Sequence, residues 1–180
     1  MKQGGVACSS ERGFITPDCK CYAKTAAGRK MQVVIVSGGA SGIGQAICEV
    51  FVKEDSTVQV VCGDVNETAG TALEEKYDGR CKFIKTDCGD AASCMNLIQK
   101  TIELYGRIDV LVNNVGVQLD DGTPTHMLDE AVWDKVLDIN LKSYFLLSKH
   151  VLSHWMDKNI KGTAIVNISS VQGLQSQPGT

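Results

Sequence analysis

Three glycines in the segment SGGASGIG have the spacing of a turn that binds a phosphate group. Gly38, Gly42 and Gly44 follow an apolar run at residues 32–37 and precede a helical pattern. Gly38 permits a sharp turn out of a strand, while the other two let the backbone approach a pyrophosphate closely. The N–H groups at the start of the following helix can then bind the anion. This spacing predicts a dinucleotide-binding turn, and a glycine-rich turn without a ligand is the less favoured alternative.

A carboxylate at the end of the next apolar run has the position of a ribose-binding acid. Asp64 lies twenty residues beyond Gly44 and follows the run at residues 56–62. A carboxylate there accepts hydrogen bonds from the ribose hydroxyls and repels a 2′-phosphate. No Arg or Lys lies in the glycine turn or directly after Asp64, where Val65 follows. The pattern favours NAD over NADP, with a solvated loop acid as the alternative.

The histidines and cysteines of the chain lack the spacing that metal-binding motifs require. His150 and His154 share a helix face, but Val151 stands where a zinc protease motif needs Glu, so we expect these histidines to face solvent or a partner. The eight cysteines include no Cys-x-x-Cys pair, and those beyond the first 30 residues fall singly in or beside regular elements. We therefore expect no metal, buried thiols rather than disulfides, and a reducing, cytoplasmic location.

Apolar runs and helical patterns alternate along the chain and supply the elements that would position these residues. The runs predict strands at residues 32–37, 56–62, 81–86, 108–114 and 163–169. The helical patterns predict helices at residues 42–53, 66–77, 90–105 and 129–158, with Asn66 as an N-cap and Gly79 and Gly106 as stops. Strands without alternating polar residues are covered on both faces, which is typical of a parallel sheet. The sequence predicts an α/β fold with a doubly wound, Rossmann-like parallel sheet of order 3-2-1-4-5.

Composition and charge exclude several classes of partner. The 180 residues carry a net charge of −3, with basic and acidic residues mixed along the chain, which argues against a nucleic-acid-binding face. No apolar run approaches the length of a membrane span. Residues 1–30 are expected to form a flexible leader, and residues 31–180 the dinucleotide-binding domain. The leader has no apolar segment of the kind that marks a secretory signal, although its basic residues leave an organelle transit peptide open.

With these motifs in register, the chain resembles the short-chain dehydrogenase/reductase family over residues 32–180. Four further segments carry the resemblance: TDCGD at residues 86–90, NNVG at 113–116, NLKSYF at 140–145 and IVNISS at 165–170. Ser37 replaces the usual Thr and Val115 the usual Ala, which leaves the hydroxyl in place and adds two methyl groups near the cofactor. A methyltransferase or an epimerase-type relative is disfavoured, because the glycine spacing differs and those proteins lack these segments.

The resemblance implies hydride transfer between a nicotinamide cofactor, NAD rather than NADP, and a small-molecule alcohol or carbonyl. Ser170 corresponds to the catalytic serine that hydrogen-bonds the substrate oxygen, and Asn140 to the asparagine that holds a water beside the catalytic lysine. Asp87 corresponds to the acid that meets the adenine amino group. Cofactor-binding positions by the same resemblance are Gly38, Ser41, Gly42, Ile43, Gly44, Asp64, Asp87, Cys88, Asn114, Val115, Gly116 and Ile168.

One part of the family's active site is absent from the sequence. The family's tyrosine base and the lysine four residues beyond it would follow Ser170, but no Tyr-x-x-x-Lys occurs in the 180 residues. The domain is therefore expected to be truncated before its last strands, and this chain to be inactive alone. The alternative to an incomplete oxidoreductase is a product that binds NAD or a partner without catalysis.

The helix predicted at residues 129–158 is apolar on more than one side. Trp133, Val136, Leu137, Tyr144 and Leu147 are predicted to share one stripe, while Ile139, Phe145, Leu146 and Leu152 lie elsewhere around the helix. A helix packed on a sheet needs only one apolar stripe. The resemblance implies that the second side packs against its copy in another subunit, so a homo-oligomer is expected. The alternative is that this side covers a longer sheet in the complete protein.

Overall fold

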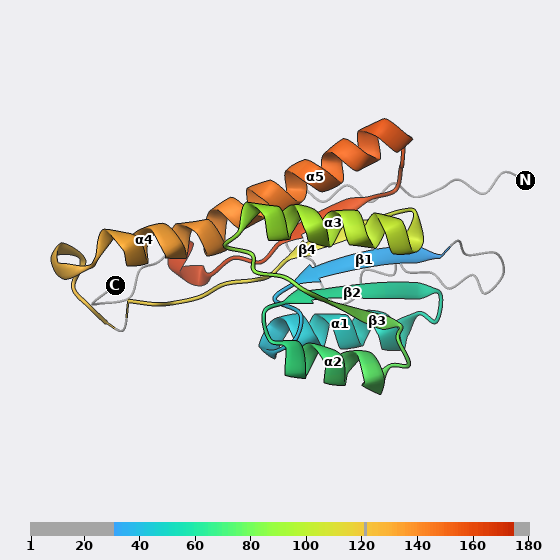
Figure 1. Ribbon diagram of the computed structural model, residues 1–180, viewed down its shortest axis with the longest axis horizontal. Coiled ribbons are helices and arrows are strands. Elements are labelled where there is room, and N and C mark those ends of the chain that lie inside the picture. Colours follow the sequence, from blue (N-terminus) through green and yellow to red (C-terminus); the bar gives the residue numbers. More distant parts are fainter. Residues whose placement is uncertain (1–30, 121, 175–180) are drawn as a thin grey trace, which may run out of the picture.

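A computed structural model describes residues 31–120 and 122–174, which form one parallel sheet covered by helices (Figure 1). The predicted leader, residues 1–30, lies outside the described residues. The strands are β1 (Gln32–Ser37), β2 (Val58–Asp64), β3 (Cys81–Lys85), β4 (Val110–Asn113) and β5 (Ala164–Asn167). They pair in parallel in the order β3-β2-β1-β4-β5, which confirms the predicted fold class and strand order.

Helices cover both faces of the sheet, as the unbroken apolar strands indicated. On one face α1 (Gly42–Glu54) and α2 (Glu67–Lys76) share one core cluster with Val34 and Val36 of β1, and α2 lies over β2 and β3. On the other, α3 (Ala91–Tyr105) and α5 (Ser143–Lys158) pack on the alternate residues of the same strand. Every β1 residue after the first is buried, because helices cover both faces of the strand. Polar and apolar residues therefore do not alternate along it.

Local sequence signals set the ends of these helices where they were expected. The side chain of Asn66 caps α2 by accepting a hydrogen bond from the Ala69 N–H at 3.0 Å. Asp90 caps α3 in the same way, through the N–H of Ser93. Gly79 and Gly106 both have a positive φ where their helices stop. None of the helices in the described part of the chain is long and apolar enough to cross a membrane.

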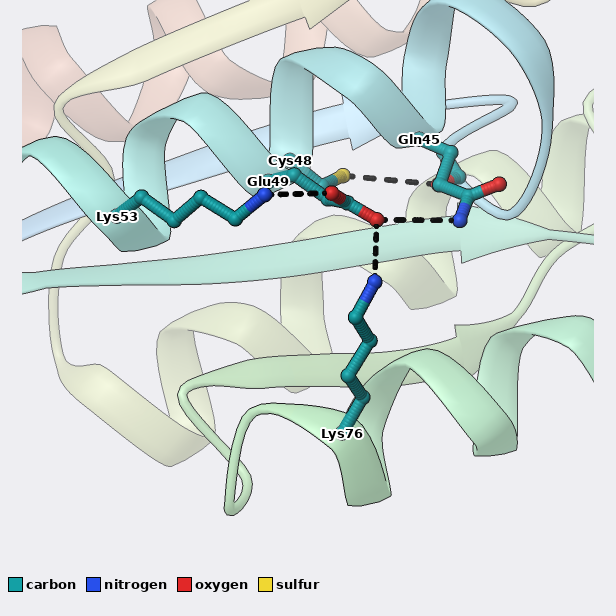
Figure 2. A network of polar contacts seen from close by, with 6 residues as sticks. Gln45, Cys48, Glu49, Lys53 and Lys76 are labelled. Carbon is teal, nitrogen blue, oxygen red and sulfur yellow. Dashed lines mark hydrogen bonds and ion pairs between the residues drawn. The ribbon is translucent and has the colours of Figure 1, made fainter.

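A carboxylate on α1 joins this helix to α2 across the surface of the sheet (Figure 2). Glu49 accepts hydrogen bonds from Lys53 at 2.9 Å, from Lys76 of α2 at 2.9 Å and from Gln45 at 3.2 Å. The ammonium groups of Lys53 and then Lys76 lower the pKa of Glu49 to about 2. The contact links the exposed surfaces of α1 and α2.

The long helix predicted at residues 129–158 is interrupted by a wider turn. It consists of α4 (Glu130–Leu137), a π-helical turn at Asp138–Lys142 and α5. A π turn holds one residue more than an α turn, so it rotates the residues beyond it relative to those before it. The buried residues include Ile139 in the π turn and, along α5, Ser143, Leu147, Val151 and Trp155.

This rotation makes the predicted apolar stripe wrong in part. Leu147 is buried, but Trp133 and Leu137, placed on the same stripe by a regular helix period, are 54% and 38% exposed. Phe145 is 63% exposed on the outer side of α5. His154, expected to face solvent or a partner, is buried, and burial lowers the pKa of its imidazole. The helix does carry two apolar sides, divided differently from the prediction.

The Asp109–Arg107 ion pair lies at the amino-terminal ends of β1 and β4. One oxygen of Asp109 accepts a hydrogen bond from the Val33 N–H at 2.9 Å and another from Arg107 Nε at 2.8 Å. Asp109 is 2% exposed, so its charge depends on these two donors. The pair therefore holds the start of β1 against the start of β4.

We expect Asp109→Ala to lower the free energy of unfolding by roughly 3 kcal/mol, because it leaves the partly buried Arg107 guanidinium and the buried Val33 N–H without their hydrogen-bond acceptor. Urea denaturation at pH 7 measures the change. Glu67→Ala is the matched control, since the Glu67–Lys85 pair is exposed and its loss costs about 1 kcal/mol or less. Equal losses for the two variants would contradict the structural role of Asp109.

Candidate functional site

The predicted cofactor residues gather around one cleft at the carboxyl ends of β1, β2 and β4. The cleft has a volume of about 380 Å³, within the range of small-molecule sites. Ten of the twelve predicted positions line it: Gly38, Ser41, Gly42, Ile43, Asp64, Asp87, Cys88, Asn114, Val115 and Gly116. Gly44 and Ile168 do not line it; Gly44 lies behind the turn, and Ile168 packs at the end of β5. No group of His, Cys, Asp or Glu side chains among the described residues is arranged to hold a metal ion.

The glycines of the turn are required by its geometry. Gly38 and Gly42 have φ values of +64° and +53°, in the left-handed region that side chains disfavour. A Cβ at Gly44 would lie 2.0 Å from the Gly38 carbonyl oxygen and 2.5 Å from Asn114 Nδ2. The first turn of α1 therefore packs directly on the backbone of the turn. This contact leaves the N-terminus of α1 facing the cleft, as an anion site requires.

Asn114 and Ser37 connect the glycine turn to the end of β4. The Asn114 side chain donates to the carbonyl oxygens of Ser37 and Gly38, both at 3.0 Å. The hydroxyl of Ser37 accepts hydrogen bonds from the N–H groups of Asn114 at 3.0 Å and Val115 at 3.3 Å. Serine at position 37 therefore keeps the backbone bond expected of a hydroxyl there.

Two carboxylates give one wall of the cleft its charge. Asp64 accepts hydrogen bonds from the Ala40 N–H at 3.0 Å and the Asn66 N–H at 2.9 Å, beside the glycine turn. Asp87 accepts one from the Gly89 N–H at 2.9 Å. The residues that line the cleft include no Lys, Arg or His. This wall therefore suits groups that donate hydrogen bonds, such as ribose hydroxyls and an adenine amino group, and disfavours additional phosphate.

Ser170 and Asn140, the predicted catalytic pair, lie together on a second cavity of about 930 Å³. Gly116 and Val117 line both this cavity and the cleft beside the glycine turn, so the two are adjacent. Much of the second cavity's wall is apolar and comes from the loop after β4 and from α4: Val117, Leu119, Leu128, Val132, Trp133 and Val136.

Asn140 lies in the π turn and binds the backbone segment that the two cavities share. Its Oδ1 accepts a hydrogen bond from the Val117 N–H, and its Nδ2 donates to the Val117 carbonyl oxygen, both at 2.8 Å. The sequence predicted a water-holding role for Asn140 and did not identify Val117 as its partner. A polar residue inside an apolar helix was the signal for such a bond, but the partner lies 23 residues away along the chain.

Tyr144 is a site residue that the sequence analysis missed. Its hydroxyl is placed to donate to the carbonyl oxygens of Val115 at 3.0 Å and Ile168 at 3.3 Å, which joins the ends of β4 and β5. Burial raises the pKa of the phenol, so the hydroxyl stays protonated as a donor. We assigned Tyr144 to an apolar stripe; the polar tip of a tyrosine one helical turn beyond Asn140 was the signal that could have identified it.

Comparisons with known proteins agree with this geometry. The model of the short chain dehydrogenase family matches residues 32–180. An uncharacterised oxidoreductase of Thermotoga maritima is 35% identical over 83% of this chain, and a 3-oxoacyl-acyl-carrier-protein reductase of the same organism is 32% identical over 82%. A 3beta-hydroxysteroid dehydrogenase of Eggerthella lenta is 27% identical over 79%. The matches span 57%, 59% and 55% of these relatives' own lengths, respectively.

We expect Asn140→Leu to raise the hydrogen-exchange rate of the Val117 amide roughly fivefold to tenfold, because one backbone hydrogen bond contributes about 1–1.5 kcal/mol. Exchange measured by NMR at constant pH gives the rate. Gln99→Leu, on the exposed side of α3, is the control and leaves Val117 unchanged. Unchanged protection of Val117 in Asn140→Leu would mean that this hydrogen bond does not hold the segment.

Proposed function

Because the chain belongs to the short-chain dehydrogenase family, we propose that the whole protein transfers a hydride between NAD(H) and a small-molecule alcohol or carbonyl. The observation that carries the proposal is the cleft in which the glycine turn, Asp64 and Asp87 meet. The relatives' names include a hydroxysteroid dehydrogenase and a 3-oxoacyl reductase, which supports a hydroxyl or keto group as the reacting group.

The cofactor binds in the proposal through residues already placed around the cleft. The start of α1 receives the pyrophosphate, since its free N–H groups and the helix dipole favour an anion. Asp64 accepts hydrogen bonds from the adenosine ribose, and Asp87 from the adenine amino group. The nicotinamide, which supplies or accepts the hydride, reaches toward Gly116 and the second cavity. Without a basic residue on the cleft wall, NAD is favoured over NADP.

The substrate occupies the second cavity in the proposal. Ser170 donates its hydroxyl proton in a hydrogen bond to the substrate oxygen, where negative charge develops during hydride transfer. Asn140 positions the Gly116–Val117 segment between cofactor and substrate. The apolar wall that includes Leu119 and Trp133 accommodates the body of the substrate.

Catalysis also needs a group that exchanges a proton with the substrate oxygen. The 180 residues contain no Tyr-x-x-x-Lys pair for this step. The second candidate function is dinucleotide or partner binding without turnover. Binding and turnover measurements separate the two candidates. We further propose a cytoplasmic homo-oligomer, with the exposed Leu137, Leu141 and Phe145 on the outer side of the long helix as its contact.

We expect NADH to bind with a Kd at least about tenfold lower than NADPH, because two carboxylates oppose a 2′-phosphate. Asp64→Asn narrows this difference, whereas Glu67→Gln, an exposed acid outside the cleft, leaves it unchanged. Fluorescence titration of the purified chain measures both constants. Tighter binding of NADPH would remove the role assigned to Asp64.

We expect Ser170→Ala to lower kcat of the whole protein by about 10²–10³, the effect of removing one donor to a developing oxyanion. The Kd for NADH stays unchanged, because the hydroxyl contacts the substrate and not the adenosine half. Steady-state kinetics with NAD⁺ and a panel of secondary alcohols give kcat, with Ser56→Ala, an exposed serine, as the control. Retention of kcat in Ser170→Ala would refute this catalytic assignment.

A further inference from the structure

Asp120, in the loop after β4, lies on the wall of the second cavity and has no part in the proposed function so far. Its backbone carbonyl oxygen accepts a hydrogen bond from the Thr123 N–H at 2.7 Å, which closes a turn of the loop. The Oδ1 atom of its side chain is buried and has no hydrogen-bond partner among the described residues. A buried carboxylate oxygen nearly always accepts a hydrogen bond, so this one points to a role outside the folded chain itself.

No positive charge on the cavity wall balances this carboxylate. The described residues that line the cavity include no Lys, Arg or His, and none of the ion pairs within the described part of the chain includes Asp120. Two basic residues lie on elements that border the cavity, His126 in the short helix η1 (Thr125–Met127) and Lys135 in α4. Both are exposed and neither lines the cavity. The electrostatic potential inside the cavity is therefore negative.

The apolar part of the wall strengthens the effect of that charge. The loop after β4 and α4 contribute five apolar side chains to the same wall: Leu119, Leu128, Val132, Trp133 and Val136. Charges interact more strongly where such groups replace water, because the effective dielectric constant falls. At an effective dielectric constant of about 20, two unit charges about 10 Å apart interact strongly enough to change a binding constant roughly tenfold.

The other polar side chains that face the substrate in the proposed function are already engaged. Both polar atoms of the Asn140 side chain are bonded to the backbone of Val117. The hydroxyl of Ser170 is assigned to the reacting oxygen of the substrate. Among the described residues that line the cavity, Asp120 is the one with a charged side chain. Any selection of the substrate by charge in this cavity therefore depends on Asp120.

We propose that Asp120 selects the substrate by charge, so that the second cavity takes an apolar alcohol or carbonyl compound without an acidic group and favours one that carries an ammonium group. An acidic group placed in the cavity is repelled by the unbalanced carboxylate. An ammonium group supplies the positive charge and the hydrogen-bond donors that the carboxylate lacks. The inference rests on the proposed function, because it names the substrate class of the same cavity.

Three cyclohexanols provide matched probes, since they share the ring and the secondary alcohol and differ only in the group at carbon 4. They are trans-4-methylcyclohexanol, trans-4-aminocyclohexanol and trans-4-hydroxycyclohexanecarboxylate, which at pH 7 are neutral, positive and negative. Binding to the purified chain, without dinucleotide, is measured by the fluorescence of Trp133 on the cavity wall. Trp155, the second of the two tryptophans, is buried and donates to the Ile108 carbonyl oxygen. Loss of the signal in Trp133→Phe places the probe in the cavity.

We expect the Kd of the acidic probe to be roughly tenfold higher than that of the methyl probe, and the Kd of the amino probe to be roughly threefold to tenfold lower. Asp120→Asn keeps the shape of the side chain and removes its charge, so both differences shrink to about twofold or less. A change that merely deformed the loop moves all three Kd values in one direction. Glu130→Gln is the matched control, because this exposed acid at the start of α4 does not line the cavity and solvent screens it.

Equal Kd values for the three probes would overturn the inference, as would differences that survive Asp120→Asn or that Glu130→Gln removes equally well. Failure of all three probes to bind would overturn it too, because the cavity then does not take an alcohol of this kind. Where Asp120→Asn fails to fold, the order of the Kd values in the unsubstituted chain decides the charge selection and Asp120→Gln assigns it. A chain that binds neither NADH nor NADPH would refute the cofactor assignment, whereas the probe measurements need no dinucleotide and still decide the role of Asp120.

Discussion

The site depends on the close contact between the first turn of α1 and the backbone of the glycine turn. Gly44 lies so near the Gly38 carbonyl oxygen and Asn114 that no side chain fits there. Asn114 in turn holds that same carbonyl, so β1, the turn, α1 and the end of β4 are fixed by one small set of backbone contacts. A free helix N-terminus is useful to an anion only when it is held in place, and this contact holds it.

The parallel sheet brings the remaining site residues to the same edge. Because all five strands run in one direction, the loops after β1, β2, β3 and β4 leave from their carboxyl ends beside one another. Asp64, Asp87 and Asn114 are far apart in the sequence and adjacent around the cleft for this reason. The buried Asp109 at the opposite end of β4 maintains the pairing on which that arrangement depends.

The sheet order, the glycine turn and Asp64 could be predicted from unbroken apolar strands, spaced glycines and a carboxylate at a strand end. The other cleft residues, such as Asp87 and Asn114, were predicted only through the resemblance to a family. The sequence did not predict the π turn at residues 138–142, since a regular helix period assigns faces without the extra residue. The partners of Asn140 and Tyr144 were missed for a related reason: they are backbone groups of Val117, Val115 and Ile168, which carry no sequence signal. Contacts between thiols that are distant in the sequence, such as Cys48 and Cys62, also cannot be predicted from the spacing of residues.

The π turn and the two missed contacts have one consequence in common. Val115, Gly116 and Val117 form the backbone between the cleft beside the glycine turn and the second cavity, and Tyr144 and Asn140 hold this segment from the same helix. Asn140 lies within the π turn and α5 follows it directly, so the extra residue of the turn sets the direction of the Asn140 side chain relative to the buried face of α5. The irregular turn therefore lets one helix pack against the sheet and still direct an amide to the boundary between two sites. In the proposed function a hydride moves between those sites over a short distance, so the position of that boundary would matter to the proposed chemistry as much as the groups that line it.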